Sequence, residues 1–249
     1  METRSIRVRV KRQESAEAKP FWEEFEIPYK AKHNIISVLM EIRRNPVTRE
    51  GKPTTPVVWE SSCLEEVCGA CTMLVNGHVR QSCTALVDQL EQPITLEPMT
   101  KFPVVRDLQV DRTRMFEALK KARTWIPIDG TYDLGPGPRI SAETQEFAYK
   151  LSRCMTCGCC LEVCPQYNDK TAFMGASTMA QVVLFNMHPT GAMNKDERLE
   201  VMMGEGGVAE CGNAQNCVQV CPKEIPLTTA IGELGRETTV KAIKDLLWK

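Results

Sequence analysis

The first hundred residues carry the hydrophobic period of strands, with one helix among them. From position 6 to position 11, Ile and Val alternate with Arg and Lys, which predicts a strand with one buried face and one basic, solvated face. The polar segment 12–20 predicts a hairpin loop. Phe21, Phe25 and Ile27 then fall on one face of a returning strand.

A helical period begins after Asn34. Apolar residues recur at positions 35, 38, 39 and 42, so we expect Asn34 to cap a helix that Pro46 ends. The short apolar run 57–59 predicts a buried strand. Asn76-Gly77 favours a two-residue hairpin turn, and apolar residues at 94 and 96 predict a closing strand.

Beyond residue 100 the pattern becomes helical. Asp111 is a candidate cap for a helix that runs to about Arg123. The segment 127–140 is so rich in Pro and Gly that we expect a domain connector there. Ser141 is a candidate cap for the helix that leads into Cys154.

The long segment 165–210 predicts two more helices, at about 177–187 and 195–203. The glycine-rich stretch 204–207 indicates a turn. A phosphate-binding loop is disfavoured there, because a strand normally precedes such a loop and none is predicted before residue 204. Pro226 suits the first turn of a last helix.

Composition limits the classes of protein that this chain can be. It has 249 residues, 43% of them hydrophobic, which is enough for two cores of ordinary size. The net charge of −1 favours neither a nucleic acid nor a membrane surface as a partner. The polar N-terminus does not resemble a signal peptide, and no apolar run predicts a membrane span. We therefore interpret the 12 cysteines as metal ligands in a reducing compartment.

The first cysteine motif lies in the predicted helical part. The stretch CMTCGCCLEVCP has cysteines at 154, 157, 160 and 164 followed by Pro165, which is the C-x2-C-x2-C-x3-C-P run that holds iron–sulfur cubanes in bacterial ferredoxins. In two-cluster proteins the fourth cysteine of each run binds the other cluster. A second run is therefore expected downstream.

The second run lacks one thiol. Cys211, Cys217 and Cys221 keep the spacing, but Ala214 stands at the second position. Crosswise pairing assigns a [4Fe–4S] cluster to Cys154, Cys157, Cys160 and Cys221. It leaves three thiolates, Cys164, Cys211 and Cys217, for the other site. One cubane corner then has no ligand, which favours a [3Fe–4S] cluster.

A third motif lies in the strand-rich part. Cys63, Cys68, Cys71 and Cys83 have the C-x4-C-x2-C spacing, with a distant fourth cysteine, of plant-type [2Fe–2S] proteins. The predicted hairpin at Asn76-Gly77 would return Cys83 towards Cys71. The alternative for all three motifs is zinc, which prefers closed sets of four ligands.

These motifs together resemble the iron–sulfur subunits of succinate dehydrogenases and fumarate reductases. The resemblance is carried by SSCLEEVCGACTMLVNG, RCMTCGCCLEVCP and CVQVCPKEIPLTTAI. It implies an electron-transfer subunit that has no catalytic residues of its own. Its expected partners are an FAD-containing flavoprotein subunit, a membrane-anchor cytochrome b subunit and quinone. The expected location is the cytoplasmic side of the cell membrane, reached through those partners.

The resemblance also implies an α+β fold in two domains. We expect a β-grasp [2Fe–2S] ferredoxin domain over 1–105, a helix and connector over 106–140, and an all-α ferredoxin domain with two cubane-type clusters over 141–249. Cys159 interrupts the cubane spacing and is interpreted as a thiol near the [4Fe–4S] cluster that is not a ligand. The three lone histidines, 33, 78 and 188, are assigned to surface or ordinary packing.

One departure concerns the quinone. Ubiquinone-linked members carry a Trp shortly after the Cys-Pro pair and a His after the first cysteine of the second run. This chain has the segment 166–169, QYND, and Gly212 there, so it is more similar to menaquinone-linked members of Gram-positive type. Two alternatives stay open: a fumarate reductase subunit that works in the reverse direction, and the electron-transfer subunit of another flavoenzyme complex.

Overall fold

The computed structural model describes residues 4–127 and 139–247. The chain forms two compact units, each with its own core. The first unit comprises Met1–Arg112 and Met155–Glu162, and the second comprises Thr113–Cys154 and Val163–Lys249. The short segment 155–162 therefore belongs with the N-terminal unit, although it lies within the first cubane motif. Most of the predicted connector 127–140 lies outside the described residues.

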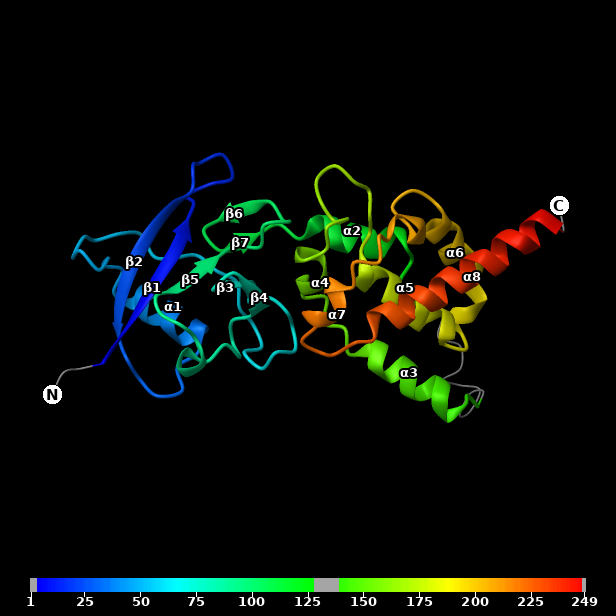
Figure 1. Ribbon diagram of the computed structural model, residues 1–249, viewed down its shortest axis with the longest axis horizontal. Helices are drawn as coiled ribbons and strands as arrows, with labels where there is room; N and C mark the ends of the chain where they lie inside the picture. The colour runs from blue at the N-terminus through cyan, green and yellow to red at the C-terminus, as the bar shows by residue number, and fades with distance from the viewer. Residues whose placement is uncertain (1–3, 128–138, 248–249) are drawn as a thin grey trace. The chain divides into compact units, whose positions relative to one another are not determined.

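The first unit is built on a five-stranded mixed sheet (Figure 1). Its order is β2-β1-β5-β3-β4, with β1 parallel to β5 and the other neighbouring pairs antiparallel. The strands are β1 Ser5–Arg12, β2 Phe21–Pro28, β3 Thr72–Val75, β4 His78–Gln81 and β5 Ile94–Glu97. Helix α1, Ile35–Arg44, packs its apolar side into the core of this sheet. The short elements are η1 Val87–Gln89 and a separate hairpin of β6 Val104–Arg106 and β7 Gln109–Val110.

Local sequence explains these elements. The apolar residues of β1 are completely buried, and its basic residues at 7, 9 and 11 point the other way, as the alternation predicts. Asn34 caps α1 with a capping box: its side chain accepts from the N–H of Ser37, and Ser37 Oγ accepts from the N–H of Asn34. Asn76 and Gly77, with φ of 50° and 77°, form the tight turn between β3 and β4. These predictions are confirmed.

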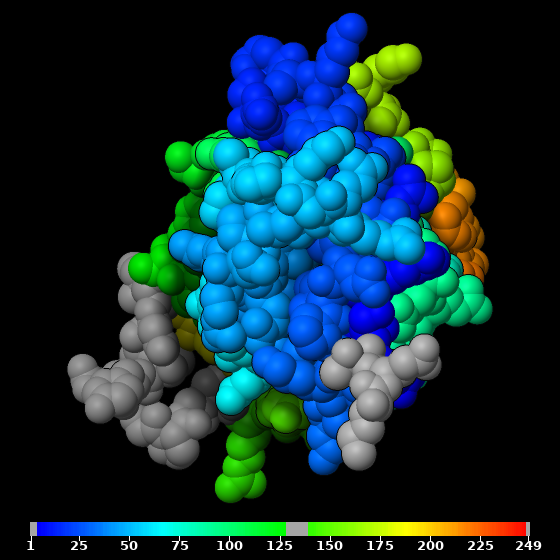
Figure 2. Space-filling view, turned by 90° about the vertical axis from the view of Figure 1, so that its left-hand side faces the viewer, coloured from blue at the N-terminus to red at the C-terminus, as the bar shows by residue number. Residues whose placement is uncertain are grey.

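Phe21, Phe25 and Ile27 share one face of β2, as predicted, although Phe21 is 41% exposed at the start of this edge strand. One local prediction in this unit is wrong. Residues 57–59 are not a strand, although Val57 is buried. The N–H of Val58 donates to the Asp107 carboxylate instead of to a neighbouring strand. Figure 2 shows the face of this unit with the segment that follows α1 in light blue at the front.

A buried ion pair closes the first unit. Arg12, 1% exposed, donates through Nε to Asp107 Oδ1 at 2.9 Å and through Nη2 to Asp107 Oδ2 at 3.2 Å. The carboxylate also accepts from the N–H groups of Gln13 and Val58. Because every oxygen is partnered, both buried charges are hydrogen-bonded as well as paired.

The second unit is helical. The helices of this unit are α2 Thr113–Lys121, α3 Ala142–Ser152, α5 Ala176–Met187, α6 Lys195–Met203, α7 Asn216–Gln219 and α8 Leu227–Leu247 (Figure 1). The remaining helix, α4 Cys159–Glu162, is part of the cubane motif and belongs to the first unit. Two 3₁₀ turns, η3 Gly191–Asn194 and η4 Val208–Glu210, lie between the helices of the second unit. Helix α5 is buried along most of its length and packs against α8 and α3. Ser141 caps α3 by accepting from the N–H of Thr144, as predicted.

Within residues 4–127 and 139–247, no helix is both long enough and apolar enough to cross a membrane.

Candidate iron–sulfur cluster sites

All twelve cysteines lie in the described part of the chain, and none of them forms a disulfide. Those of the plant-type motif, 63, 68, 71 and 83, are in the first unit. Those of the incomplete cubane site, 164, 211 and 217, are in the second. The four predicted [4Fe–4S] ligands divide between the units, with Cys157 and Cys160 in the first and Cys154 and Cys221 in the second.

The loop from Cys63 to Cys71 turns its backbone donors towards its own sulfurs. Cys63 Sγ accepts from the N–H groups of Glu65, Val67 and Cys68 at 3.3–3.4 Å. The N–H of Ala70 lies 3.4 Å from Cys68 Sγ. These donors lower the pKa of the Cys63 thiol to about 7, with the Glu65 N–H as the largest cause. A loop that stabilises thiolates in this way fits a cluster, whose sulfurs accept the same hydrogen bonds.

The backbone of this loop is wound by residues of positive φ. Leu64, Glu66 and Gly69 have φ of 62°, 56° and 70°. Alternation of left-handed and ordinary residues points successive N–H groups inwards, which forms a concave anion-binding surface. No sequence pattern predicts Leu64 or Glu66 in that conformation.

Cys71 and Cys83, the other two predicted ligands of this motif, flank the β3–β4 hairpin. Both are buried, and Cys71 leads directly into the β3–β4 hairpin, which returns the chain to Cys83. The N–H of Ser82 donates to the Cys71 carbonyl at 3.2 Å, and the Asn34 side chain donates to the Cys83 carbonyl at 2.8 Å. Burial raises the pKa of Cys71 to about 11. The predicted return of the fourth cysteine by the hairpin is the observed arrangement.

The segment 155–162 packs on the same unit through β4. Cys159 is 1% exposed, and its Sγ accepts from Gln81 Nε2 at 3.4 Å. A hydrogen bond with Cys157 raises the pKa of Cys159, and burial raises it further. The same hydrogen bond is the main cause of the lowered pKa of Cys157, about 7. The Cys159 thiol therefore lies beside the sulfur of Cys157.

The three thiols of the incomplete motif surround one hollow in the second unit. Its lining includes Cys164, Cys211 and Cys217, and Ala214 faces the same space. The apolar side chains of Phe173 and Ile231 complete the wall. Burial raises the pKa of Cys217, and the nearby Cys164 and Cys211 raise it further. The three thiols and the Ala214 methyl group thus line one hollow.

The loop around Ala214 has the same left-handed winding as the first site. Asn213 and Gln215 have φ of 51° and 61°, on either side of Ala214. The side chain of Asn216 donates to the Val163 carbonyl at 3.1 Å and so joins the two cysteine runs. A side chain at Gly212 would meet Gln166 Nε2 at 2.5 Å, so Gln166 fills the space beside this position.

Sequence reasoning missed one further residue at the sites. Glu162 is 7% exposed and accepts from Thr100 N, Thr100 Oγ1 and Lys101 N at 2.6–3.0 Å. It fixes α4 to the segment after β5. Its partners lie some sixty residues away in the sequence, so no local pattern could identify them.

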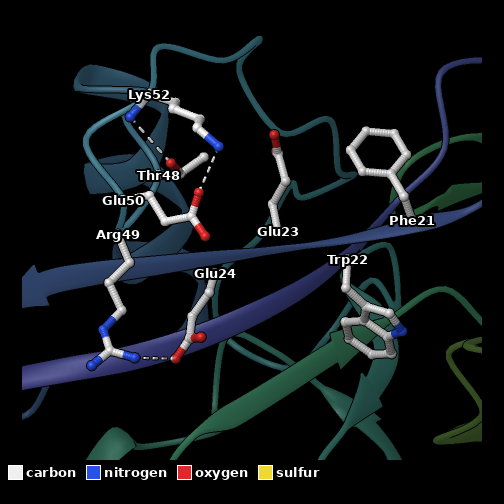
Figure 3. Close-up of a pocket in the computed structure, with 8 residues that line it drawn as sticks. All are labelled: Phe21, Trp22, Glu23, Glu24, Thr48, Arg49, Glu50 and Lys52. Atoms are coloured by element: carbon white, nitrogen blue, oxygen red, sulfur yellow. Dashed lines mark hydrogen bonds and ion pairs between the residues drawn. The ribbon is translucent and has the colours of Figure 1, made fainter.

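Two further features lie outside the cysteine motifs. His188 caps its own turn, since Nδ1 accepts from the N–H groups of Thr190 and Gly191. A hollow on β2 lies beside exposed Phe21 and Trp22 (Figure 3). Its charged residues pair with one another, Arg49 with Glu24 and Lys52 with Glu50.

In the described part of the chain, no three Cys, His, Asp or Glu side chains converge as they would around a single metal ion. An iron–sulfur cluster is several atoms wide, so its thiolates need not point to one centre.

Comparison with known proteins first defines the class. Residues 7–117 match a 2Fe-2S iron-sulfur cluster binding domain, and residues 150–225 match a 4Fe-4S dicluster domain. A chain of the solved Mycobacterium smegmatis Sdh1 complex in the apo form shares the fold, with a TM-score of 0.79 and 22% identity over 96% of this chain and 97% of that chain. The fold is therefore α+β, a strand-rich [2Fe–2S] domain followed by a helical dicluster domain, as predicted.

A close relative then defines the family. The succinate dehydrogenase iron-sulfur subunit of Bacillus subtilis is 64% identical over 244 residues, which cover 98% of this chain and 96% of the relative. The fumarate reductase iron-sulfur subunit of Wolinella succinogenes is 29% identical over 90% of this chain and 92% of that relative. This chain belongs to the family of succinate dehydrogenase iron–sulfur subunits.

Proposed function

We propose that this chain is the iron–sulfur subunit of a succinate dehydrogenase complex and conducts electrons from a flavoprotein to quinone. The observation that carries the proposal is the 64% identity to the Bacillus subtilis subunit over nearly the whole of both chains. Two local features support it: the backbone donors that face Cys63, and the hollow lined by Cys164, Cys211 and Cys217. The chain contributes to an oxidoreductase without holding substrate itself.

The three groups of cysteines are assigned as in the sequence analysis. A [2Fe–2S] cluster is held by Cys63, Cys68, Cys71 and Cys83, and a [4Fe–4S] cluster by Cys154, Cys157, Cys160 and Cys221. A [3Fe–4S] cluster is held by Cys164, Cys211 and Cys217. When bound, these clusters supply one-electron redox steps whose potentials depend on charge, hydrogen bonds and exposure. The residues of the chain hold the clusters, donate N–H groups to cysteine sulfurs and place the Cys159 thiol beside Cys157.

The order of the sites follows from their partners. Electrons from reduced FAD of the flavoprotein subunit enter at the [2Fe–2S] site and leave from the [3Fe–4S] site. The acceptor is quinone at a membrane-anchor cytochrome b subunit, which would place the chain at the cytoplasmic side of the cell membrane. Ubiquinone-linked members have a Trp in the segment that corresponds to 166–169 and a His at the position of Gly212. This chain has QYND and glycine there, which supports menaquinone as the acceptor.

Fumarate reduction is the second candidate. The fumarate reductase subunits are recognisable relatives, but at 28–29% identity against 64% for the succinate dehydrogenase subunit. Both activities use the same chain of clusters, so the direction depends on the potentials of the quinone and of the clusters. Comparison of succinate oxidation with fumarate reduction by the purified complex, using a menaquinone analogue, decides between them.

Electron paramagnetic resonance of the purified complex tests the assignment. We expect a three-iron signal in the oxidised protein, a [2Fe–2S] signal after mild reduction and a [4Fe–4S] signal after dithionite. Chemical analysis should find roughly nine irons per copy of this chain, as these three cluster types require. Two complete cubanes without a [2Fe–2S] signal, or zinc in place of iron, would contradict the proposal.

A further inference from the structure

Arg112 holds the backbone of the [2Fe–2S] loop between two of its cysteines. Its Nη1 donates to the Gly69 carbonyl at 3.0 Å, and its Nη2 donates to the Ala70 carbonyl at 2.7 Å. The side chain is only 12% exposed. A guanidinium that donates to two successive carbonyls fixes the orientation of both peptide groups.

The orientation matters because each peptide unit is planar and trans, so its C=O and N–H point in opposite directions. The Gly69 carbonyl shares its peptide with the N–H of Ala70, and that N–H faces Cys68 Sγ at 3.4 Å. Arg112 and a predicted ligand sulfur therefore lie at opposite ends of one peptide group. A cation on the oxygen polarises the N–H and strengthens its bond to the sulfur.

The same loop touches the cubane motif. Gly69 has φ of +70°, and a Cβ built there would lie 2.6 Å from Cys157 Cα and 2.7 Å from Cys157 Cβ. The [2Fe–2S] loop and a predicted [4Fe–4S] ligand are thus in direct backbone contact.

The charge of Arg112 is only weakly neutralised. The carboxylate paired with it is Glu60, at 3.7 Å from Nη2 and with its side chain 37% exposed. Arg112 Nε is buried and has no hydrogen-bond partner among the described residues. The contacts of Arg112 with the two loop carbonyls, at 3.0 and 2.7 Å, are shorter than this ion pair, so its charge lies against the [2Fe–2S] loop.

We propose that Arg112 is a positioning residue for electron transfer between the [2Fe–2S] site and the cubane site that contains Cys157. Its hydrogen bonds orient N–H groups towards the [2Fe–2S] ligands, and its charge stabilises the reduced state at the point where the two loops meet. In the step itself, one electron leaves the first site, which is oxidised, and reduces the second, with no bond broken and no proton moved. The inference rests on the proposed function.

Two substitutions in the whole complex separate charge from geometry. Arg112→Gln removes the charge, so we expect the [2Fe–2S] midpoint potential to fall. The expected change in the one-electron equilibrium constant is about tenfold, or about 59 mV. Arg112→Lys keeps the charge but cannot bridge both carbonyls, so the potential should fall less while the line shape of the [2Fe–2S] resonance changes. Both are measured by redox titration with electron paramagnetic resonance.

A third variant should shift the [2Fe–2S] midpoint potential in the opposite direction while it keeps the two hydrogen bonds from Arg112 to the loop. Glu60→Gln removes the partly exposed carboxylate beside Arg112, and we expect it to raise the [2Fe–2S] potential. Arg44→Gln is the matched control, because this arginine is 75% exposed on α1 and should leave the potential unchanged. If the Arg112 variants do not assemble, the Glu60→Gln result alone decides.

The outcomes distinguish this inference from the proposed function. Unchanged potentials in Arg112→Gln and Glu60→Gln, with all clusters present, would overturn the role of Arg112 and leave the proposed function intact. Absence of a [2Fe–2S] signal from the unmodified complex would overturn the proposed function itself. Cluster loss in Arg112→Gln together with no shift in Glu60→Gln would reduce Arg112 to a structural residue.

Discussion

The contact between Gly69 and Cys157 predicts that even a methyl group at position 69 damages the site. In Gly69→Ala the new Cβ would lie 2.6 Å from Cys157 Cα, a backbone atom that cannot rotate away. Alanine also tolerates the φ of +70° poorly. We therefore expect the [2Fe–2S] loop to separate from Cys157, which lengthens the gap between the two clusters.

The hairpin offers a matched control for the magnitude. Gly77 has φ of +77°, but nothing lies within 4 Å of a Cβ built there. Both substitutions to alanine carry a left-handed strain of about 1–2 kcal/mol. Only Gly69→Ala adds overpacking, typically about 1–3 kcal/mol. The two variants should therefore differ in free energy of unfolding by the cost of overpacking alone. For a chain of this size, each kcal/mol of that difference lowers Tm by roughly 2–4 °C.

The assay is thermal unfolding of the purified complex at one scan rate, followed by the visible absorption of the clusters. Electron paramagnetic resonance of the same samples reports whether the [2Fe–2S] signal is retained. Gly69→Ala should unfold at the lower temperature and alter that signal, whereas Gly77→Ala should leave it unchanged. Equal unfolding temperatures and identical spectra in the two variants would refute the reasoning from the Gly69–Cys157 contact.

Three further predictions concern other positions. Ala214→Cys should supply the missing thiolate and favour a [4Fe–4S] cluster of lower potential. Because about 30 mV is roughly 0.7 kcal/mol for one electron, a drop of a few hundred millivolts would slow quinone reduction but spare artificial acceptors that take electrons from the flavin. Retention of the three-iron resonance with normal quinone turnover would exclude Ala214 as the cause. Cys159→Ser should keep all three clusters, measured by iron content and resonance, and loss of the [4Fe–4S] signal would identify Cys159 as a ligand. Asn34→Ala removes the α1 cap and also the hydrogen bond to the Cys83 carbonyl, so it should lower stability by at least about 1 kcal/mol, seen as a lower Tm; an unchanged Tm would contradict the capping role.

Local features of this protein were readable from its sequence. The alternation in β1, the Asn34 and Ser141 caps and the Asn76-Gly77 turn depend on residues within a few positions of one another, so their pattern specifies their structure. The spacing of the first cysteine motif belongs to the same kind, because the loop from Cys63 to Cys71 directs its own N–H groups towards its own sulfurs. The bounds of α6 were also predicted, since its helical period is uninterrupted.

Long-range packing decided the rest. The segment 155–162 reads as part of the helical half, yet it packs on the β3–β4 hairpin through Cys159 and Gln81, 78 residues apart. Phe21 follows the strand period and is still exposed, because only the tertiary structure makes β2 an edge.

The roles of Arg112 and Glu162 likewise depend on carbonyl and N–H partners more than forty residues away. The sequence alone predicts which cysteines hold clusters, because the spacing within each motif is a local pattern. Which residues bring the loops together and set their charge depends on distances that only the folded chain defines.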